Sequence, residues 1–89
     1  MRIITLDIEK MRSLPMLHKY LHTALDLPEY YGANLDALHD CLTEIVEPTE
    51  LVVPKKVAQE DYLGWYGEQF LQMLQDAAAA NEALKITLR

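Results

Sequence analysis

Three short apolar runs along the chain have the pattern of β-strands. Residues 2–8 alternate weakly between polar and apolar side chains, and residues 51–53 are a Leu-Val-Val run. Residues 84–88 place a leucine or isoleucine at every second position. A period of two, with β-branched side chains, is typical of strands that bury one face. The sequence therefore predicts three strands, near its start, its middle and its end.

Two segments between the first and second strands have helical spacing. The first helix is predicted to begin after the N-cap Ser13, to tolerate Pro15 in its first turn and to end before Pro28. The second is predicted to begin after the N-cap Asn34 and to end near Glu47. Their apolar stripes consist of Leu14, Leu17, Leu21, Ala24 and Leu25, and of Leu35, Leu38, Leu42 and Ile45, with Cys41 beside them.

After the middle strand the sequence predicts one weak and one strong helix. Pro54 is expected to open a short helix whose apolar repeat is poor. Gly64 and Gly67 are expected to break the chain around an aromatic pair. Residues 68–80 carry an apolar stripe followed by four alanines, the best helix formers, and are predicted to be a helix that stops at Asn81.

The predicted order of elements is β-α-α-β-(α)-α-β. Strands separated by helices favour parallel pairing, because a parallel connection needs a crossover of a dozen or more residues. We therefore expect an α/β fold: a three-stranded parallel sheet packed with three to four helices. A chain of 89 residues, 51% of them hydrophobic, suits one domain covering residues 1–89.

Composition and charge narrow the classes of function. The formal net charge of −6 argues against binding to nucleic acid or to an anionic membrane surface, and favours a basic partner. No apolar stretch approaches the roughly 20 residues that span a bilayer. Asp7 and Glu9 interrupt the segment that a signal peptide would need, so we expect a cytoplasmic protein. Cys41, the one cysteine, fits a reducing compartment and a packing role.

The second predicted helix has an acidic side opposite its leucines. That side carries Asp36, His39, Asp40, Thr43 and Glu47. Asp36 and Asp40 are one turn apart, and like charges at this spacing destabilise an isolated helix by a few tenths of a kcal/mol. An acidic stripe that opposes its own helix suggests a positive partner.

Four interpretations of this stripe remain open on the residues alone. Asp36, His39 and Asp40 could bind a metal, although three ligands from one helix leave the coordination sphere incomplete. Acid–base catalysis has little support, since no motif supplies a nucleophile or an oxyanion hole. Carboxylates on a rigid helix could bind a cationic surface. A solvated helix face is the fourth interpretation, and charge pattern alone favours it.

Histidines and aromatic residues outside the stripe are expected to be structural. His18 and His22 are predicted to lie on the surface of the first helix. Tyr31, Trp65 and Tyr66 are predicted to pack in the core or at its edge. No cofactor and no metal site are expected.

The segment 27–43, LPEYYGANLDALHDCLT, resembles the signature of the barstar family, small intracellular inhibitors of secreted bacterial ribonucleases. Length, element order and a Leu71-Gln72 pair shortly before Asp76 agree with this resemblance. It implies three parallel strands covered by helices. It also implies a non-enzymatic protein that binds a basic, extracellular-type ribonuclease one to one, without a small-molecule substrate. In that family the loop and second helix plug the active site, and helix carboxylates occupy places meant for RNA phosphates.

The resemblance also assigns residues. Asp40 matches the central carboxylate that meets the arginines and catalytic histidine of the enzyme, and Asp36 matches a second interfacial acid. Tyr30 matches an aromatic residue packed on that histidine, and Asp76 an acid facing the enzyme's basic rim. Further expected partner-binding positions are Gly32, Asn34, Leu35, His39, Thr43 and Glu44.

Three positions depart from the family pattern. His39 stands where a tryptophan is familiar, Ile45 replaces another aromatic residue, and Glu44 replaces a glycine. A protonated His39 between the two aspartates would neutralise part of the stripe. His39 and Ile45 keep an alternative open, in which a barstar-like interaction module binds a different toxin or regulator that is not a ribonuclease.

Overall fold

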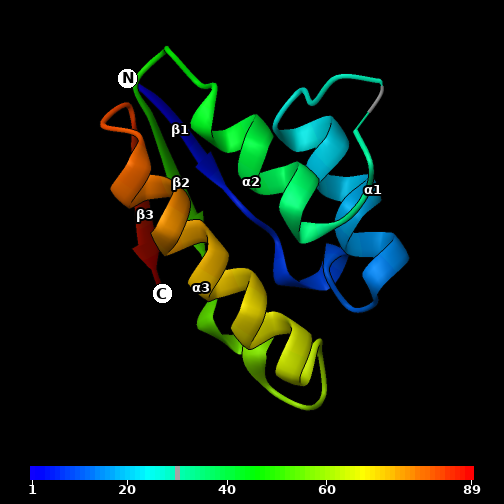
Figure 1. Ribbon diagram of the computed structural model, residues 1–89. Helices are drawn as coiled ribbons and strands as arrows, with labels where there is room; N and C mark the ends of the chain where they lie inside the picture. The colour runs from blue at the N-terminus through cyan, green and yellow to red at the C-terminus, as the bar shows by residue number, and fades with distance from the viewer. Residues whose placement is uncertain (30) are drawn as a thin grey trace.

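A computed structural model describes residues 1–29 and 31–89 of the chain, in which helices separate each strand from the next (Figure 1). No helix within this described part is long and apolar enough to cross a membrane. The elements, in order, are β1 (Arg2–Thr5), the 3-10 helix η1 (Ile8–Lys10), α1 (Leu14–Ala24), α2 (Leu35–Thr43), β2 (Thr49–Val53), the 3-10 helix η2 (Lys55–Ala58), α3 (Gly64–Ala80) and β3 (Leu84–Leu88).

The three strands form one parallel sheet in the order β1-β2-β3. Its register aligns Ile4 of β1 with Leu51 of β2 and Ile86 of β3. Both crossovers move in the same direction across the sheet, so the right-handed rule for such crossovers places all the helices on one face. The predicted α/β fold with a three-stranded parallel sheet is confirmed.

The two faces of the sheet differ in burial, as this arrangement requires. On the helix side, Leu51, Val53 and Leu84 are fully or almost fully buried. On the opposite side Ile3 is 63% exposed, and Glu50 accepts a hydrogen bond from the Thr87 hydroxyl at 2.6 Å. Figure 1 shows α2 and α3 lying over the same face of the strands. The sheet is therefore covered on one side.

The core lies between this covered face and the three α-helices. Every α-helix contributes buried side chains at helical spacing, and burying each leucine or phenylalanine stabilises the fold by about 1.5–3 kcal/mol. The residues concerned are Leu17 and Leu21 of α1, Leu38 and Leu42 of α2, and Phe70, Leu74 and Ala77 of α3. Cys41 is half-buried and packs against this core.

The predicted helix boundaries hold at three positions. The Ser13 hydroxyl accepts a hydrogen bond from the Met16 amide at 3.3 Å, and Asn34 caps α2. Asn81 follows the last residue of α3. Helix α2 is shorter than predicted, because it ends at Thr43 rather than near Glu47.

Two other boundaries also differ from the sequence prediction. Strand β1 ends at Thr5, and the carboxylate of Asp7 then accepts a hydrogen bond from the Glu9 amide at 3.0 Å. This local bond favours the short η1 helix over a longer strand. The weak helix expected after Pro54 is present only as η2.

The expected break at Gly64 and Gly67 is wrong, because both residues belong to α3. Gly64 begins the helix with a φ of +54°, a conformation that glycine adopts without strain. Gly67 is buried inside the helix, where a Cβ would lie 2.0 Å from the Val57 carbonyl oxygen. Here glycine permits close packing of α3 on η2. The core position expected for Trp65 is also wrong, since this side chain is 71% exposed.

Candidate functional site

The turn before α2 sets the direction of that helix. The Asn34 side-chain oxygen accepts a hydrogen bond from the Ala37 amide at 2.8 Å, and its amide nitrogen donates to the Gly32 carbonyl at 3.2 Å. Ala33 has a φ of +52°, which turns the chain sharply between these two contacts. Asn34 thus fixes both the loop and the first turn of α2. Tyr30, predicted to contact a partner, lies outside the described residues.

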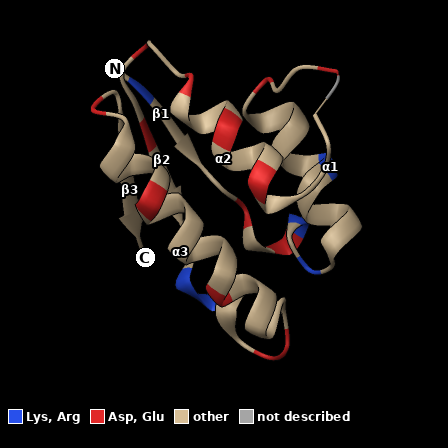
Figure 2. Cartoon of the chain, viewed as in Figure 1, with Lys and Arg blue, Asp and Glu red and all other residues tan. Residues whose placement is uncertain are grey.

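Three acidic residues form a row along the exposed side of α2. Asp36, Asp40 and Glu44 follow one another at intervals of four residues, and all three are exposed. Helix α2 contains no lysine or arginine, and Figure 2 shows the basic positions on other elements. Within the described residues the ion pairs are Arg2 with Glu47, and Arg12 with Glu9. We call Asp36, Asp40 and Glu44 the acidic row; it has no cationic partner in this part of the chain.

A shallow hollow of about 250 Å³ separates the acidic row from α3. Asp36 and His39 of α2 line it on one side and Asp76 of α3 on the other. The Gln72 side chain donates a hydrogen bond to the Asp76 carboxylate at 3.1 Å. The remaining lining residues are Leu35, Gln69 and Met73. Acids from two helices therefore face one hollow, and both carboxylates can form charge-assisted hydrogen bonds with a cationic side chain that enters it.

A second hollow, of about 240 Å³, lies on the other side of the acidic row. Asp40 and Glu44 line it together with Tyr31 and Gly32 from the loop. Cys41 also faces it, and burial, with smaller effects of Glu44 and Asp40, raises the pKa of its thiol. A raised pKa keeps the thiol protonated and unreactive, which agrees with its predicted packing role.

The structure brings together most of the residues predicted to bind a partner. Gly32, Asp40 and Glu44 line one hollow, and Leu35, Asp36, His39 and Asp76 line the other. The Thr43 hydroxyl donates to the Asp40 carbonyl at 2.9 Å, at the end of α2. His39 lines the hollow against α3 together with Asp36, whereas Asp40 lines the hollow beside the loop.

The metal-binding interpretation is not supported by this geometry. His39 and Asp40 line different hollows, so they do not converge with Asp36 on one point. Within residues 1–29 and 31–89, no group of three or more His, Cys, Asp or Glu side chains is arranged to hold a metal ion.

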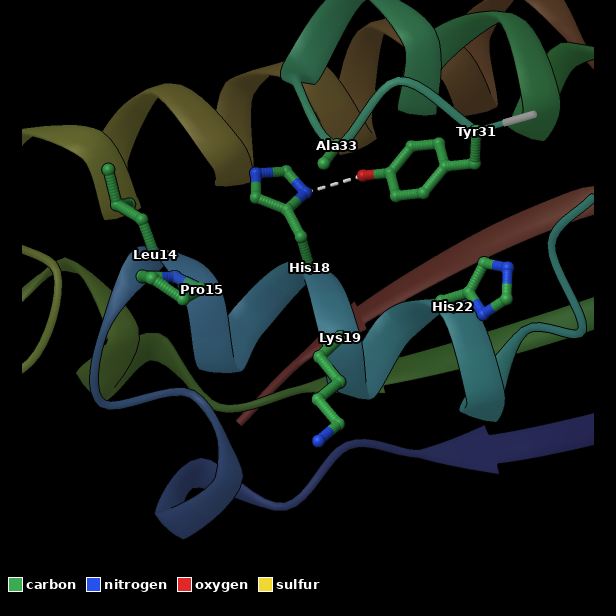
Figure 3. A pocket seen from close by; sticks show the side chains of 7 residues that line it. All are labelled: Leu14, Pro15, His18, Lys19, His22, Tyr31 and Ala33. Atoms are coloured by element: carbon green, nitrogen blue, oxygen red, sulfur yellow. Dashed lines mark hydrogen bonds between the residues drawn. The ribbon is translucent and has the colours of Figure 1, made fainter. Parts of the chain in front are cut away.

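A larger hollow of about 490 Å³ lies between α1 and the loop, and sequence reasoning did not predict it (Figure 3). It is lined by Leu14, Pro15, His18, Lys19, His22, Tyr31 and Ala33.

His18 lines this hollow, yet it is buried, with 7% of its surface exposed, so its predicted surface position is wrong. Burial lowers the pKa of its imidazole from the usual 6.5. Position 18 lies four residues after Leu14 and three before Leu21, on the edge of the apolar stripe, and this spacing was the available signal. His22 is half-buried and stacks on Tyr31.

The fold and surface define a small α/β domain in which helices cover one face of a parallel sheet. Helix α2 of this domain presents unpaired carboxylates. The family model described as "Barstar (barnase inhibitor)" matches residues 1–89, and the chain therefore belongs to the barstar family. The chain is also 41% identical over 78 residues to a protein of Bacillus subtilis (strain 168) named "Putative ribonuclease inhibitor YrdF". That match covers 86% of each protein.

Proposed function

We propose that this protein inhibits a barnase-type ribonuclease by covering its active site with the acidic row and the adjoining loop. Membership of a family described as barnase inhibitors supports this role, as does the similarity to a protein named as a ribonuclease inhibitor. The protein acts as a binding partner and not as an enzyme. One inhibitor binds one basic, extracellular-type ribonuclease in the cytoplasm of the cell that makes the enzyme.

The observation that carries the proposal is the acidic row without cations on its own helix. Asp36, Asp40 and Glu44 repel one another, which works against α2 in the free protein. Ribonucleases bind the RNA phosphates through cationic side chains, and carboxylates can pair with the same groups. Charge-assisted hydrogen bonds between carboxylate and guanidinium are about twice as strong as neutral ones. The complex supplies the cations that α2 lacks.

In this mechanism, cationic side chains of the enzyme enter the two hollows beside the acidic row. Asp40, with Glu44 next to it, faces the hollow that adjoins the loop, and meets the cations that bind the scissile phosphate. Asp36 and Asp76 face the hollow against α3 and receive an arginine or lysine from the rim of the enzyme. Gly32, Asn34, Leu35, His39 and Thr43 complete the contact surface.

Inhibition by the Asp40→Asn variant tests the proposal. The change keeps the side-chain shape and removes one charge, so it should weaken binding by about 2 kcal/mol or more, roughly thirtyfold. This is the general figure for charged anchors in protein interfaces, this family's complexes among them. The measurement is the inhibition constant against a barnase-type ribonuclease.

Glu60→Gln is the matched control, because it removes one charge from an exposed position in the turn between η2 and α3. If loss of overall charge were the cause, both variants would weaken inhibition equally. A wild-type protein that inhibits no barnase-type ribonuclease would overturn the proposal. Recovery of a partner without nuclease activity from the native cell would then favour the interaction module that His39 and Ile45 keep open.

A further inference from the structure

The ring of His18 joins three parts of the molecule. Its Nδ1 lies 2.5 Å from the Tyr31 hydroxyl in the loop, and its Nε2 lies 2.8 Å from the Tyr66 hydroxyl of α3. Figure 3 shows the ring pointing from α1 towards Tyr31. Both ring nitrogens are therefore engaged, and they link α1, the loop and α3. We call His18, Tyr31 and Tyr66 the histidine node.

Residues 31–34 of the loop form few other hydrogen bonds to the body of the protein. The Tyr31 amide donates to the Pro28 carbonyl at 3.0 Å, and the Asn34 side chain reaches the Gly32 carbonyl, so these bonds stay within the loop. The Tyr31 ring also stacks on His22, with ring centres 6.4 Å apart. Of the side-chain hydrogen bonds described for residues 31–34, only the one from Tyr31 to His18 leaves the loop and the first turn of α2.

Protonation of His18 changes the hydrogen bonds that the histidine node can form. A neutral imidazole has one donor and one acceptor nitrogen, so one tyrosine hydroxyl donates to it and the other accepts from it. In the imidazolium both nitrogens donate, so both hydroxyls must accept. The hydroxyl that donated before must then turn its proton away from the ring. A positive charge also enters a buried site, which is costly unless an anion balances it.

The groups around the ring do not supply that anion. Tyr31 and Tyr66 face it, and burial raises the pKa of both hydroxyls, which keeps them neutral. On α1 the neighbouring titratable groups are Lys19 and His22, both cationic when charged, and Lys19 extends away from the ring in Figure 3. From α2, the Cys41 thiol adds to the rise in the pKa of the Tyr31 hydroxyl. The pKa of this thiol is itself raised, so Cys41 is also neutral. The charge on His18 is therefore uncompensated.

We propose that His18 is a positioning residue, which holds residues 31–34 in the shape that binds the partner and releases them when it is protonated. This inference rests on the proposed inhibitory function, because residues 31–34 adjoin the acidic row. Gly32 and Tyr31 line the hollow that Asp40 and Glu44 share. Loosening Tyr31 disturbs that hollow without touching a carboxylate, so the inhibitor binds its ribonuclease less tightly in mild acid.

Affinity measured against pH tests the role of His18. Between about pH 8 and pH 5.5, wild-type affinity should fall several-fold more than that of His18→Gln. The full tenfold of a one-unit pKa shift is not reached at pH 5.5, because the pKa of His18 already lies below 6.5 in the free protein. A glutamine can donate and accept hydrogen bonds at this place but cannot titrate. Titration of the enzyme and of the carboxylates is common to both proteins and cancels in this comparison. His22→Gln, on the same helix, should keep the wild-type dependence.

Tyr31→Phe provides a second variant that leaves His18 bonded to Tyr66 and keeps the ring stacked on His22. It should bind more weakly near pH 8 and lose the extra pH dependence, because the link from the node to the loop is gone. Equal pH dependence in wild type, His18→Gln and Tyr31→Phe would overturn the proposal.

NMR titration of the free protein separates this inference from the proposed function. The amide signals of Gly32 and Ala33 should shift with the same midpoint as the ring signals of His18. A His18 titration that leaves those amides unmoved would overturn the positioning role. This measurement needs no ribonuclease, so it decides the role of His18 even if the wild-type protein fails to inhibit such an enzyme.

Discussion

The side chain of Asn81 donates a hydrogen bond to the carbonyl oxygen of Leu42 at 3.0 Å, and so joins the end of α3 to the end of α2. The same amide nitrogen lies 2.9 Å from the Ile45 carbonyl, and the side-chain oxygen accepts from the Ala83 amide at 3.0 Å. Carbonyls in the last turn of a helix lack intrahelical donors. Asn81 supplies a donor to the last turn of α2 from another element, and so stabilises the end of this helix at Thr43.

Replacement of Asn81 by aspartate should destabilise the protein strongly for its size. The new carboxylate would keep the acceptor for Ala83 but would place a charged oxygen against the carbonyl oxygens of Leu42 and Ile45, at the C-terminal end of α2. Loss of these partly buried bonds costs about 1–3 kcal/mol, and the helix dipoles add to it. Chemical denaturation measures the change. Asn34→Asp is the comparison, because aspartate caps a helix as well as asparagine does and the change removes only one exposed hydrogen bond, to the Gly32 carbonyl. Its loss of stability should be clearly smaller, and an equal loss would contradict this explanation.

Gly67→Ala should also destabilise the protein, against the usual effect of this change. Alanine in a helix is normally favoured over glycine by about 1 kcal/mol. At position 67, however, the new Cβ would lie 2.0 Å from the Val57 carbonyl oxygen and 2.6 Å from its carbon, so η2 has to move. Overpacking costs about 1–3 kcal/mol or more, which exceeds the gain in helix propensity.

The melting temperature provides the measurement for Gly67→Ala. Gly32→Ala is the comparison, since its Cβ would meet only the Asn34 side-chain amide at 3.2 Å and the Ala37 methyl group at 3.5 Å. A Gly67→Ala protein that melts at or above the wild-type temperature would show that η2 and α3 do not pack this closely.

These residues illustrate which parts of the structure the sequence could predict. Ser13 and Asn34 cap their helices through bonds to amides three residues away, so local sequence is enough to find them. The break predicted at Gly67 is wrong, because the reason for a glycine there lies in η2, ten residues earlier along the chain. Asn81 ends α3 as its local sequence predicts, but its bonds to α2, about 40 residues away, are beyond any local pattern.

The residues of the candidate site also differ in whether local sequence can predict them. The acidic row is a periodic feature of one helix, so Asp36 and Asp40 could be found from spacing and from the family signature. The hollow that joins Asp76 to His39 needs the packing of α2 on α3, and His18 needs two tyrosines from separate elements. A histidine on the edge of an apolar stripe indicates burial but does not name its partners.

Stability should depend on pH through His18. Burial lowers its pKa in the folded protein below the value of 6.5 that it has when exposed. Between these two pKa values the unfolded chain binds a proton that the folded protein does not, so the free energy of unfolding falls as pH drops below about 6.5. Above that pH the contribution of His18 is constant. The contribution of neutral His18 to the free energy of unfolding is thus present in neutral solution and lost in mild acid.

Urea denaturation between about pH 7.5 and pH 5 measures this slope, at pH values above most carboxylate titration. His18→Gln should flatten the curve, whereas His22→Gln and His39→Gln should leave it unchanged, because neither of these rings is buried as His18 is. A wild-type protein whose stability stays level through this range would contradict a buried, neutral His18.

Asp40→Asn should make the free protein slightly more stable while it weakens inhibition. Asp40 lies one turn from Asp36 and one turn from Glu44, so its removal relieves two like-charge contacts, about 0.5 kcal/mol together. Asparagine and aspartate have similar propensities inside a helix, and the Thr43 hydroxyl bonds to the backbone of residue 40, so neither effect opposes the gain. Salt screens the repulsion, and the gain should shrink as ionic strength rises.

Asp36→Asn is the comparison for this charge effect, because Asp36 lies in the first turn of α2, where the helix dipole favours a negative charge. Removing that charge relieves one repulsion and loses the dipole interaction, so its net effect on stability should be close to zero. Thermal unfolding at low and high salt measures both variants. A less stable Asp40→Asn protein would mean that Asp40 serves the fold, and the unpaired row would no longer indicate an absent cationic partner.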